Sequence, residues 1–382
     1  MAIKEARAER IRGFDGIRGL AALAVVVHHT IIYNTRLGSV AVELFFEISG
    51  FLILGMLYDA RSAVEQGRSN AKSELLHFWR NRALRIFPVY YTALLSIFVL
   101  SVFLPRLLGS VIGHFLWYLT YTQNFLIAFI TKAWGPFTQT WTLAVEQQFY
   151  VLFALIFLFI PTNRFRLAFA VLALLCVGAN EALVLANQRK AISTLPFDGF
   201  IYIIAGGWIS ISQRRWTRHN ASAKGAELTL WVLAVAIVVY SVLPSSLANL
   251  TPAALTSLPL AISMGVFIVL LTSNPNSGLA RFLEMRWLVS LGSLSYALYV
   301  VHAPVAAIVS RLEAGHVTRG RRAIFFLATL GISLILSVMS RKFIERPALA
   351  LKTRRRARAS AVEPSKVLGA RPETQSVLGG EP

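Results

Sequence analysis

Residues 18–29 read Arg18-Gly-Leu-Ala-Ala-Leu-Ala-Val-Val-Val-His28-His29, an apolar run with ionisable groups at both ends. In an α-helix, eleven residues make about three full turns plus 20°, so Arg18 and His29 share one face and His28 points about 100° away. Ionisable groups inside a membrane span are costly and usually face a protein interior or a wet cavity. The stretch therefore predicts a membrane helix with a functional site that includes His29 rather than His28. The plainer alternative is a snorkelling arginine and a structural histidine bonded to another helix.

The composition is that of a membrane protein. The chain has 382 residues, of which 56% are hydrophobic, and its mean hydropathy is positive. Long apolar runs recur along almost its whole length, which excludes an ordinary soluble domain. The net charge of +20 does not indicate nucleic-acid binding, because the lysines and arginines lie between apolar segments and in the C-terminal part, as in membrane-protein loops. The single cysteine, Cys176, excludes an internal disulfide.

Several apolar segments are long enough to cross a bilayer, which requires about 20 residues each. They are residues 14–33, 41–59, 86–104, 141–160, 167–187, 197–212, 227–244, 253–272, 287–309 and 323–342. We therefore predict an all-α fold, a polytopic transmembrane helical bundle with about ten spans that occupies residues 1–350.

The basic residues orient these spans and decide the ambiguous stretch 111–130, which is aromatic and broken by polar residues. If 111–130 does not span and both termini are cytoplasmic, most of the 38 lysines and arginines fall on the cytoplasmic side. We therefore predict both termini inside, with 111–130 as an outer interfacial or re-entrant segment. The loop 311–322 would lie on the outer side in this arrangement although it is basic, which conflicts with the positive-inside rule. Residues 351–382 are expected to be a basic, disordered cytoplasmic tail that contacts anionic membrane lipid.

Two pairs of charged residues one helical turn apart are candidates for a site. Glu43 and Glu47 are i, i+4 neighbours, and a buried Glu43 could orient His29 and stabilise its charged form. The alternative for Glu43 is a residue at the outer interface. Arg82 and Arg85 are i, i+3 neighbours, and two guanidinium groups on one face suit a phosphate or pyrophosphate. The alternative for this pair is ordinary positive-inside charge.

Polar residues also mark two later spans. Glu146 begins one span with Tyr150 on its face, and a structural role is as consistent with this position as a catalytic one. Ser295, Tyr299 and His302 follow the spacing i, i+4, i+7 and form one polar stripe on an apolar helix. Such a stripe can carry chemistry or simply hydrogen-bond neighbouring helices.

Taken in chain order, these elements resemble the acyltransferase-3 family of integral membrane acyltransferases, which includes bacterial O-acetyltransferases of surface polysaccharides and Nod factors. The matching motifs are Phe14-Asp-Gly-Ile-Arg18-Gly-Leu-Ala-Ala through His29, Leu-Phe-Phe-x-x-Ser-Gly-Phe at 44–51, Arg82 and Arg85 with Phe-Pro-x-Tyr-Tyr, Trp-x-Leu-x-x-Glu-x-x-Phe-Tyr at 141–150, Ser-Tyr-x-Leu-Tyr-x-x-His-x-Pro at 295–304, and Glu345-Arg-Pro. The resemblance covers about residues 10–350. Glu43 replaces the usual Asp, and Glu47 replaces a common aliphatic residue. The sequence after residue 350 is too short for the esterase-like domain that many relatives carry, so none is expected there.

The resemblance implies an enzyme of the bacterial cytoplasmic (inner) membrane. Such proteins move an acyl group, usually acetyl, from cytoplasmic acyl-CoA to a hydroxyl across the membrane, so the expected acceptor is a surface or exported carbohydrate. Acetyl-CoA or another acyl-CoA is the expected donor substrate, and no metal is expected. The residues expected to bind the CoA phosphates are Arg18, Arg82 and Arg85.

The same resemblance assigns roles to the other candidates. His29 is expected to act as a general base or as a transient acyl carrier, oriented by Glu43, while Glu146 or His302 helps at the acceptor. The residues expected on the acceptor substrate side are Ser295, Tyr299 and His302. The alternative function is a proton-coupled transporter or a flippase for a glycan or small molecule, with the buried histidines and glutamates as a proton relay.

Overall fold

A computed structural model describes residues 11–214, 223–244, 253–312 and 321–351. Over these residues the chain is helical and has no strand apart from one isolated bridge between Thr35 and Pro244. The predicted all-α bundle is confirmed. The predicted tail, almost all of 351–382, and most of the predicted basic loop 311–322 lie outside the described residues.

Ten long helices coincide with the ten predicted spans. They are α1 (Phe14–Thr30), α2 (Leu37–Glu65), α3 (Ala71–Phe103), α7 (Trp141–Phe159), α8 (Phe165–Leu185), α10 (Pro196–Gln213), α11 (Ala223–Val242), α13 (Ala253–Ser273), α15 (Arg286–Leu312) and α16 (Arg321–Ser340). Within the described ranges, nine of them are long and apolar enough to cross a membrane. The remaining one, α1, has 17 residues and extends over about 25 Å. The orientation with both termini inside stays a prediction.

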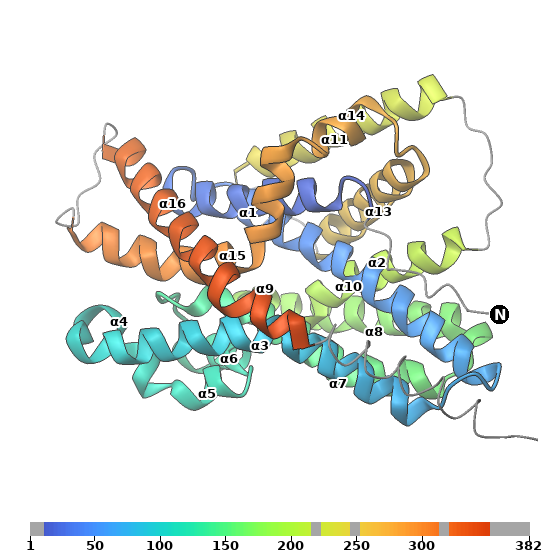
Figure 1. The fold of residues 1–382 in the computed structure, drawn as a ribbon, viewed down its shortest axis with the longest axis horizontal. Coiled ribbons are helices and arrows are strands. Elements are labelled where there is room, and N and C mark those ends of the chain that lie inside the picture. Colours follow the sequence, from blue (N-terminus) through green and yellow to red (C-terminus); the bar gives the residue numbers. More distant parts are fainter. Residues whose placement is uncertain (1–10, 215–222, 245–252, 313–320, 352–382) are drawn as a thin grey trace, which may run out of the picture.

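The stretch 111–130 does not form a span. It falls within short helical pieces that gather beside one end of α3 (Figure 1). These pieces are α4 (Pro105–Gly113), α5 (Phe115–Leu119), α6 (Gln123–Phe125) and a π-helix, Leu126–Thr131. Tyr121 interrupts them with a left-handed φ of 55°, and its ring stacks on Tyr90 at 4.2 Å. The Tyr90 hydroxyl donates to the Tyr118 carbonyl at 2.7 Å, so α3 holds this segment in place.

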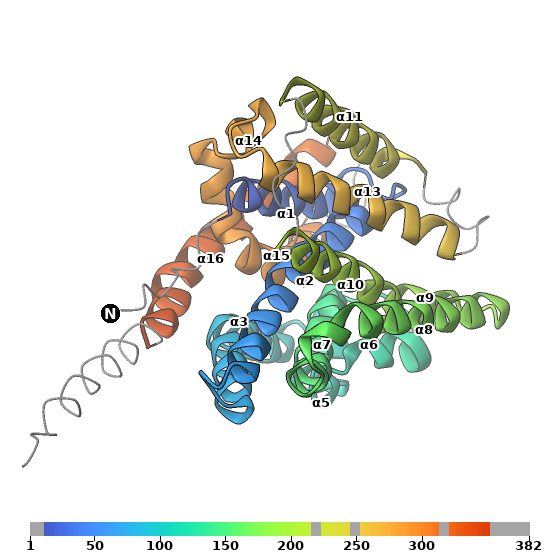
Figure 2. The ribbon, with the colours of Figure 1, turned by 90° about the vertical axis from the view of Figure 1, so that its right-hand side faces the viewer.

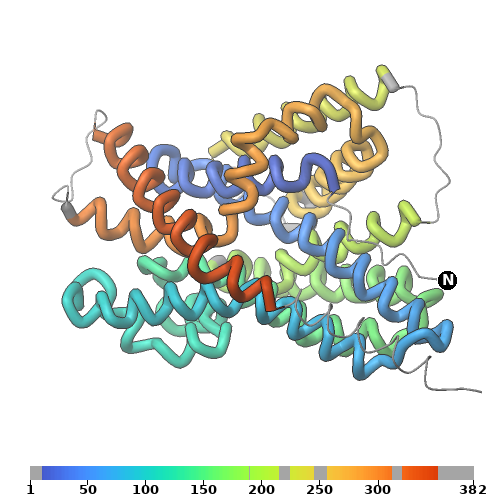
Figure 3. Tube along the Cα trace, viewed as in Figure 1, coloured from blue at the N-terminus to red at the C-terminus, as the bar shows by residue number. Residues whose placement is uncertain are grey.

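The centre of the bundle is built from two close helix pairs, α1 with α15 and α2 with α10, and α1 also packs on α2 (Figure 3). Glycines at the crossing points let the α2 and α10 backbones touch. A Cβ on Gly50 would collide with the Ile203 carbonyl, and a Cβ on Gly206 would collide with the Glu47 carbonyl. The helix α11 lies at the edge of the bundle, on the side away from α3 (Figure 2). The glycine crossings therefore set how closely the site-bearing helices approach.

Replacing Gly206 with valine should destabilise the fold. The added side chain meets backbone atoms of α2, which cannot rotate away, so the expected cost is about 3 kcal/mol or more. Gly178→Val is the matched control, because Gly178 in α8 faces open space. Thermal unfolding of the detergent-solubilised variants measures the difference. Equal melting temperatures for the two variants would show that the α2–α10 crossing does not depend on this glycine.

Candidate active site

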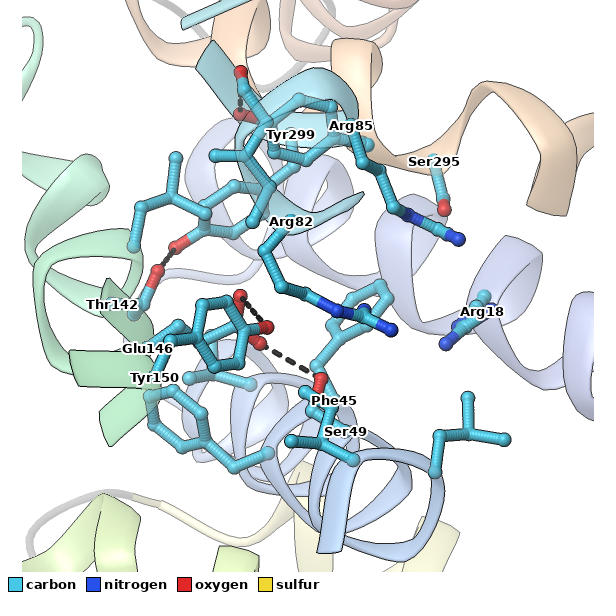
Figure 4. A pocket seen from close by; sticks show the side chains of 17 residues that line it. Arg18, Phe45, Ser49, Arg82, Arg85, Thr142, Glu146, Tyr150, Ser295 and Tyr299 are labelled. Carbon is cyan, nitrogen blue, oxygen red and sulfur yellow. Dashed lines mark hydrogen bonds between the residues drawn. The ribbon is translucent and has the colours of Figure 1, made fainter. Parts of the chain in front are cut away.

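Three arginines and one glutamate line a small cavity in the bundle, which we call the arginine pocket. Its volume is about 100 Å³, and its walls include Arg18, Arg82, Arg85 and Glu146. Arg18 comes from the second turn of α1, and Arg82 and Arg85 lie one turn apart on α3. Figure 4 shows these side chains reaching into the pocket from the separate helices. The tertiary fold thus joins the predicted donor-binding residues in one place.

Glu146 is held by neutral donors rather than by the arginines. The Ser49 hydroxyl donates to its Oε1 at 2.8 Å, and the Tyr150 hydroxyl donates to its Oε2 at 3.3 Å (Figure 4). Within the described part of the chain, no ion pair joins Glu146 to Arg18, Arg82 or Arg85. Among the described residues that line the pocket, three arginines face one carboxylate in a largely apolar wall. The pocket is therefore suited to an anion, above all to phosphate oxygens.

A second, larger cavity lies beside the C-terminal end of α1. Its volume is about 770 Å³. Its walls include His28 and His29 from α1, Glu43 from α2, and Asp198 from the first turn of α10. Trp134 contributes from the segment before α7. The cavity thus combines two imidazoles with two carboxylates and is large enough for a small-molecule or sugar ligand.

His29 has a defined tautomer in this cavity. Its Nδ1 lies 2.9 Å from the Val25 carbonyl. Because a carbonyl only accepts, Nδ1 carries a proton, and in the neutral ring Nε2 therefore carries a lone pair. His302 is fully buried and follows the same rule, with Nδ1 2.7 Å from the Tyr299 carbonyl. The two rings meet at 5.1 Å between centroids. His29 is therefore prepared to accept a proton at Nε2, next to a second neutral imidazole.

The neighbouring His28 sits differently. Its ring packs on α2 so closely that a Cβ on Gly38 would lie 2.5 Å from the ring. It also lines the second cavity, so both histidines reach this space. Of the two, His29 is the one in contact with His302.

The two cavities meet at a common wall. Val42, Phe46 and Tyr299 line both of them. The Tyr299 hydroxyl is fixed at 2.8 Å from the Gln139 carbonyl and 2.7 Å from the Thr142 hydroxyl. Along α1, the eleven residues from Arg18 to His29 extend over about 16 Å. The chain thus places the arginine pocket and the cavity that contains His29 on either side of a shared wall.

The structure distributes the predicted site residues over these two cavities. Ser295 and Glu146, expected near the acceptor, line the arginine pocket instead. Tyr299 lies between the cavities, and His302 lies behind His29. Helical spacing places Ser295, Tyr299 and His302 on one face of the helix. It does not specify which cavity each position along that face reaches, so one stripe can extend from the first cavity to the second.

Glu43 lines the same cavity as His29 but has other neighbours. Its electrostatic partners are Asp198 and Arg36, with the Tyr202 hydroxyl close by. The described hydrogen bonds of His29 do not include Glu43, because the His29 Nδ1 proton goes to the α1 backbone. The hydrogen bond described for His29 is thus to its own helix backbone, and orientation of His29 by Glu43 stays a prediction.

Sequence reasoning missed several residues of the site. Arg36 and Asp198 both line the second cavity, and Ser49 holds Glu146. Asp198 had a usable signal, since a carboxylate in the first turn of an apolar helix is costly in a membrane unless it has a role. Ser49 stands in the Leu-Phe-Phe-x-x-Ser-Gly-Phe motif at 44–51, but nothing in that motif indicated that its hydroxyl would hold Glu146.

Comparisons with known proteins agree with the motif pattern. A family model described as an acyltransferase domain matches residues 11–338. The O-acetyltransferase OatA of Staphylococcus aureus is 23% identical over 360 residues, which cover 88% of this chain and 56% of that protein. The peptidoglycan O-acetyltransferase OatA of Listeria monocytogenes is 24% identical, over 88% of this chain and 55% of that protein. The chain spans about half the length of these curated relatives. No solved structure gives a significant match.

Proposed function

This chain belongs to the acyltransferase-3 family, and on that premise we propose that it is a membrane O-acyltransferase. In this proposal it moves an acetyl group from acetyl-CoA to a hydroxyl group of a surface or exported carbohydrate. The observation that carries the proposal is the convergence of three arginines next to a cavity lined by His29, whose Nδ1 is bonded to the Val25 carbonyl. The names of the bacterial relatives, one of them a peptidoglycan O-acetyltransferase, support a carbohydrate acceptor.

The arginine pocket supports the donor half of this reaction. Coenzyme A carries several phosphate charges, and guanidinium groups bind phosphate oxygens through paired hydrogen bonds. The cavity of about 100 Å³ is smaller than ordinary ligand sites of about 300–1,000 Å³. Only part of the donor therefore enters it, and the rest lies outside, at the end of the bundle where α1 begins. This end is the cytoplasmic one in the predicted orientation, which agrees with a cytoplasmic supply of acyl-CoA.

The second cavity supports the acceptor half. The Nε2 atom of His29 takes the proton from the acceptor hydroxyl, and the hydroxyl oxygen attacks the thioester carbonyl carbon. The carbon–sulfur bond breaks, and the thiolate of coenzyme A recovers the proton from His29. The products are an O-acetyl ester and free coenzyme A, so no further reactant is needed. Since the wall of Val42, Phe46 and Tyr299 borders both cavities, the thioester is expected to react there.

Reconstituted protein tests the proposal against its alternative. With acetyl-CoA inside vesicles and a carbohydrate acceptor outside, we expect free thiol to be released and acetyl ester to form in equal amounts. A proton-coupled transporter or flippase consumes no thioester, so the absence of thiol release with intact transport of a glycan would contradict the proposal. Mass spectrometry of surface glycans from cells with and without the gene then identifies the acceptor, expected to lose acetyl groups in the deletion strain.

A further inference from the structure

The second cavity contains three ionisable side chains that the proposed transfer reaction does not use. Arg36 directly precedes α2, Glu43 lies two turns into that helix, and Asp198 lies in the first turn of α10. All three line the cavity. They come from separate segments that meet only in the folded chain.

These charges do not neutralise one another by contact. The Ser257 hydroxyl donates to Asp198 Oδ1 at 2.6 Å. Glu43 is only 8% exposed, yet its Oε2 has no hydrogen-bond partner among the described residues. The Arg36 guanidinium stacks on the Tyr240 ring at 4.4 Å, and within the described ranges no ion pair joins it to Glu43 or Asp198. Buried polar groups left without partners are costly unless a ligand completes them.

The surrounding wall favours a sugar as that ligand. Trp134 and Trp141 offer aromatic surfaces, while Gln139 and Asn187 offer amide groups in the same cavity. Aromatic rings cover the apolar C–H faces of a sugar, and carboxylates and amides accept hydrogen bonds from its hydroxyls. Among the described residues lining the cavity, Arg36 is the one arginine or lysine. The lining thus holds two acidic side chains and one arginine, while Lys190 lies over the Trp134 ring at 4.5 Å from its centroid. The acidic side chains of the wall therefore favour an uncharged sugar over an acidic one.

We propose that Arg36, Glu43 and Asp198 form the subsite for an uncharged sugar ring of the acceptor. Glu43 and Asp198 accept hydrogen bonds from its hydroxyls, and Arg36 donates to one of its oxygens. This inference rests on the proposed acyl transfer. It assigns Glu43 to acceptor binding and leaves the orientation of His29 to the Val25 carbonyl.

Steady-state kinetics of the Glu43→Gln and Asp198→Asn variants separate an effect on acceptor binding from an effect on the chemical step. The probe is chitotetraose, an uncharged tetrasaccharide. Loss of a charged hydrogen bond corresponds to about tenfold or more in affinity, so we expect the acceptor KM to rise at least about tenfold in each variant. The acetyl-CoA KM and the slow hydrolysis of acetyl-CoA without acceptor are expected to stay within about twofold. Glu47→Gln is the matched control, because Glu47 is fully buried one turn further along α2 and lines neither cavity.

Other outcomes overturn the subsite. If Glu43→Gln lowers kcat and acceptor-free hydrolysis together while the acceptor KM is unchanged, Glu43 acts on the chemistry and not on the sugar. Calorimetry on the wild-type protein gives an independent readout, because it compares chitotetraose with an oligogalacturonide of the same length. No binding of chitotetraose, or tighter binding of the acidic sugar, also contradicts the inference. A wild-type protein that binds chitotetraose but never consumes acetyl-CoA would refute the acyltransferase proposal and leave the sugar subsite standing.

Discussion

Replacing His29 with alanine should lower kcat for acetyl transfer by about 10²–10⁴-fold, the usual contribution of a general base. The Nδ1 proton of His29 is committed to the Val25 carbonyl, so Nε2 is the atom that can take the hydroxyl proton. Alanine removes that atom and leaves the arginine pocket intact. Coenzyme A binding by the variant is therefore expected to be unchanged, which calorimetry can verify alongside the rate measurement.

His28→Ala is the control for this experiment. Both histidines line the second cavity, but only His29 of the two contacts His302, and His28 packs on Gly38 of α2. We expect His28→Ala to keep acetylation within about tenfold of the wild type, because no step of the proposed transfer uses its ring. Loss of acetylation in His28→Ala with normal activity in His29→Ala would reverse the assignment.

The double substitution of Arg82 and Arg85 by glutamine should weaken coenzyme A binding by at least about a hundredfold. Each charge-assisted hydrogen bond contributes about 1.5–3 kcal/mol, and two such groups are removed together. Of the three arginines that line the pocket, only Arg18 then remains, so the pocket keeps a single guanidinium group for the phosphates. The stabilisation that coenzyme A gives to the purified protein in thermal unfolding should disappear in the variant.

Arg80→Gln is the matched control for the arginine pair. Arg80 lies on the same helix, two residues before Arg82, but its guanidinium contacts His77 at 3.3 Å and does not line the pocket. We expect its thermal shift with coenzyme A to equal that of the wild type. An unchanged shift in the double variant, or an equal loss in Arg80→Gln, would place the donor elsewhere.

The helices of this protein follow from local properties of the sequence. In lipid, every backbone polar group must be satisfied inside its own segment, so an apolar run of sufficient length forms a helix almost regardless of its neighbours. This is why the ten predicted spans match ten helices. The stretch 111–130 was recognisable as an exception because polar residues interrupt it and because counting it as a span would move basic loops later in the chain to the outer side.

The pairing of charged residues is partly local as well. Arg82 and Arg85 share a face of α3 by spacing alone, and a phosphate site was predictable from them. The family resemblance implied that Arg18 lies with Arg82 and Arg85. It did not imply that Glu146 lines the same pocket. Ser295 shows the limit, because its face was predictable but its place in the arginine pocket was not.

Local sequence patterns were enough to predict the helices, the helix faces that carry ionisable groups and the family of the chain. The packing of the helices was needed to place Glu43 near Asp198 and Arg36. It was also needed to bring two cavities together at Val42, Phe46 and Tyr299. The physical reason lies in the helix crossings. The spacing of residues along one helix specifies only the angles between their side chains around the helix axis. The depth and rotation of that helix relative to its neighbour depend on contacts between residues far apart in the chain, such as Gly206 against Glu47.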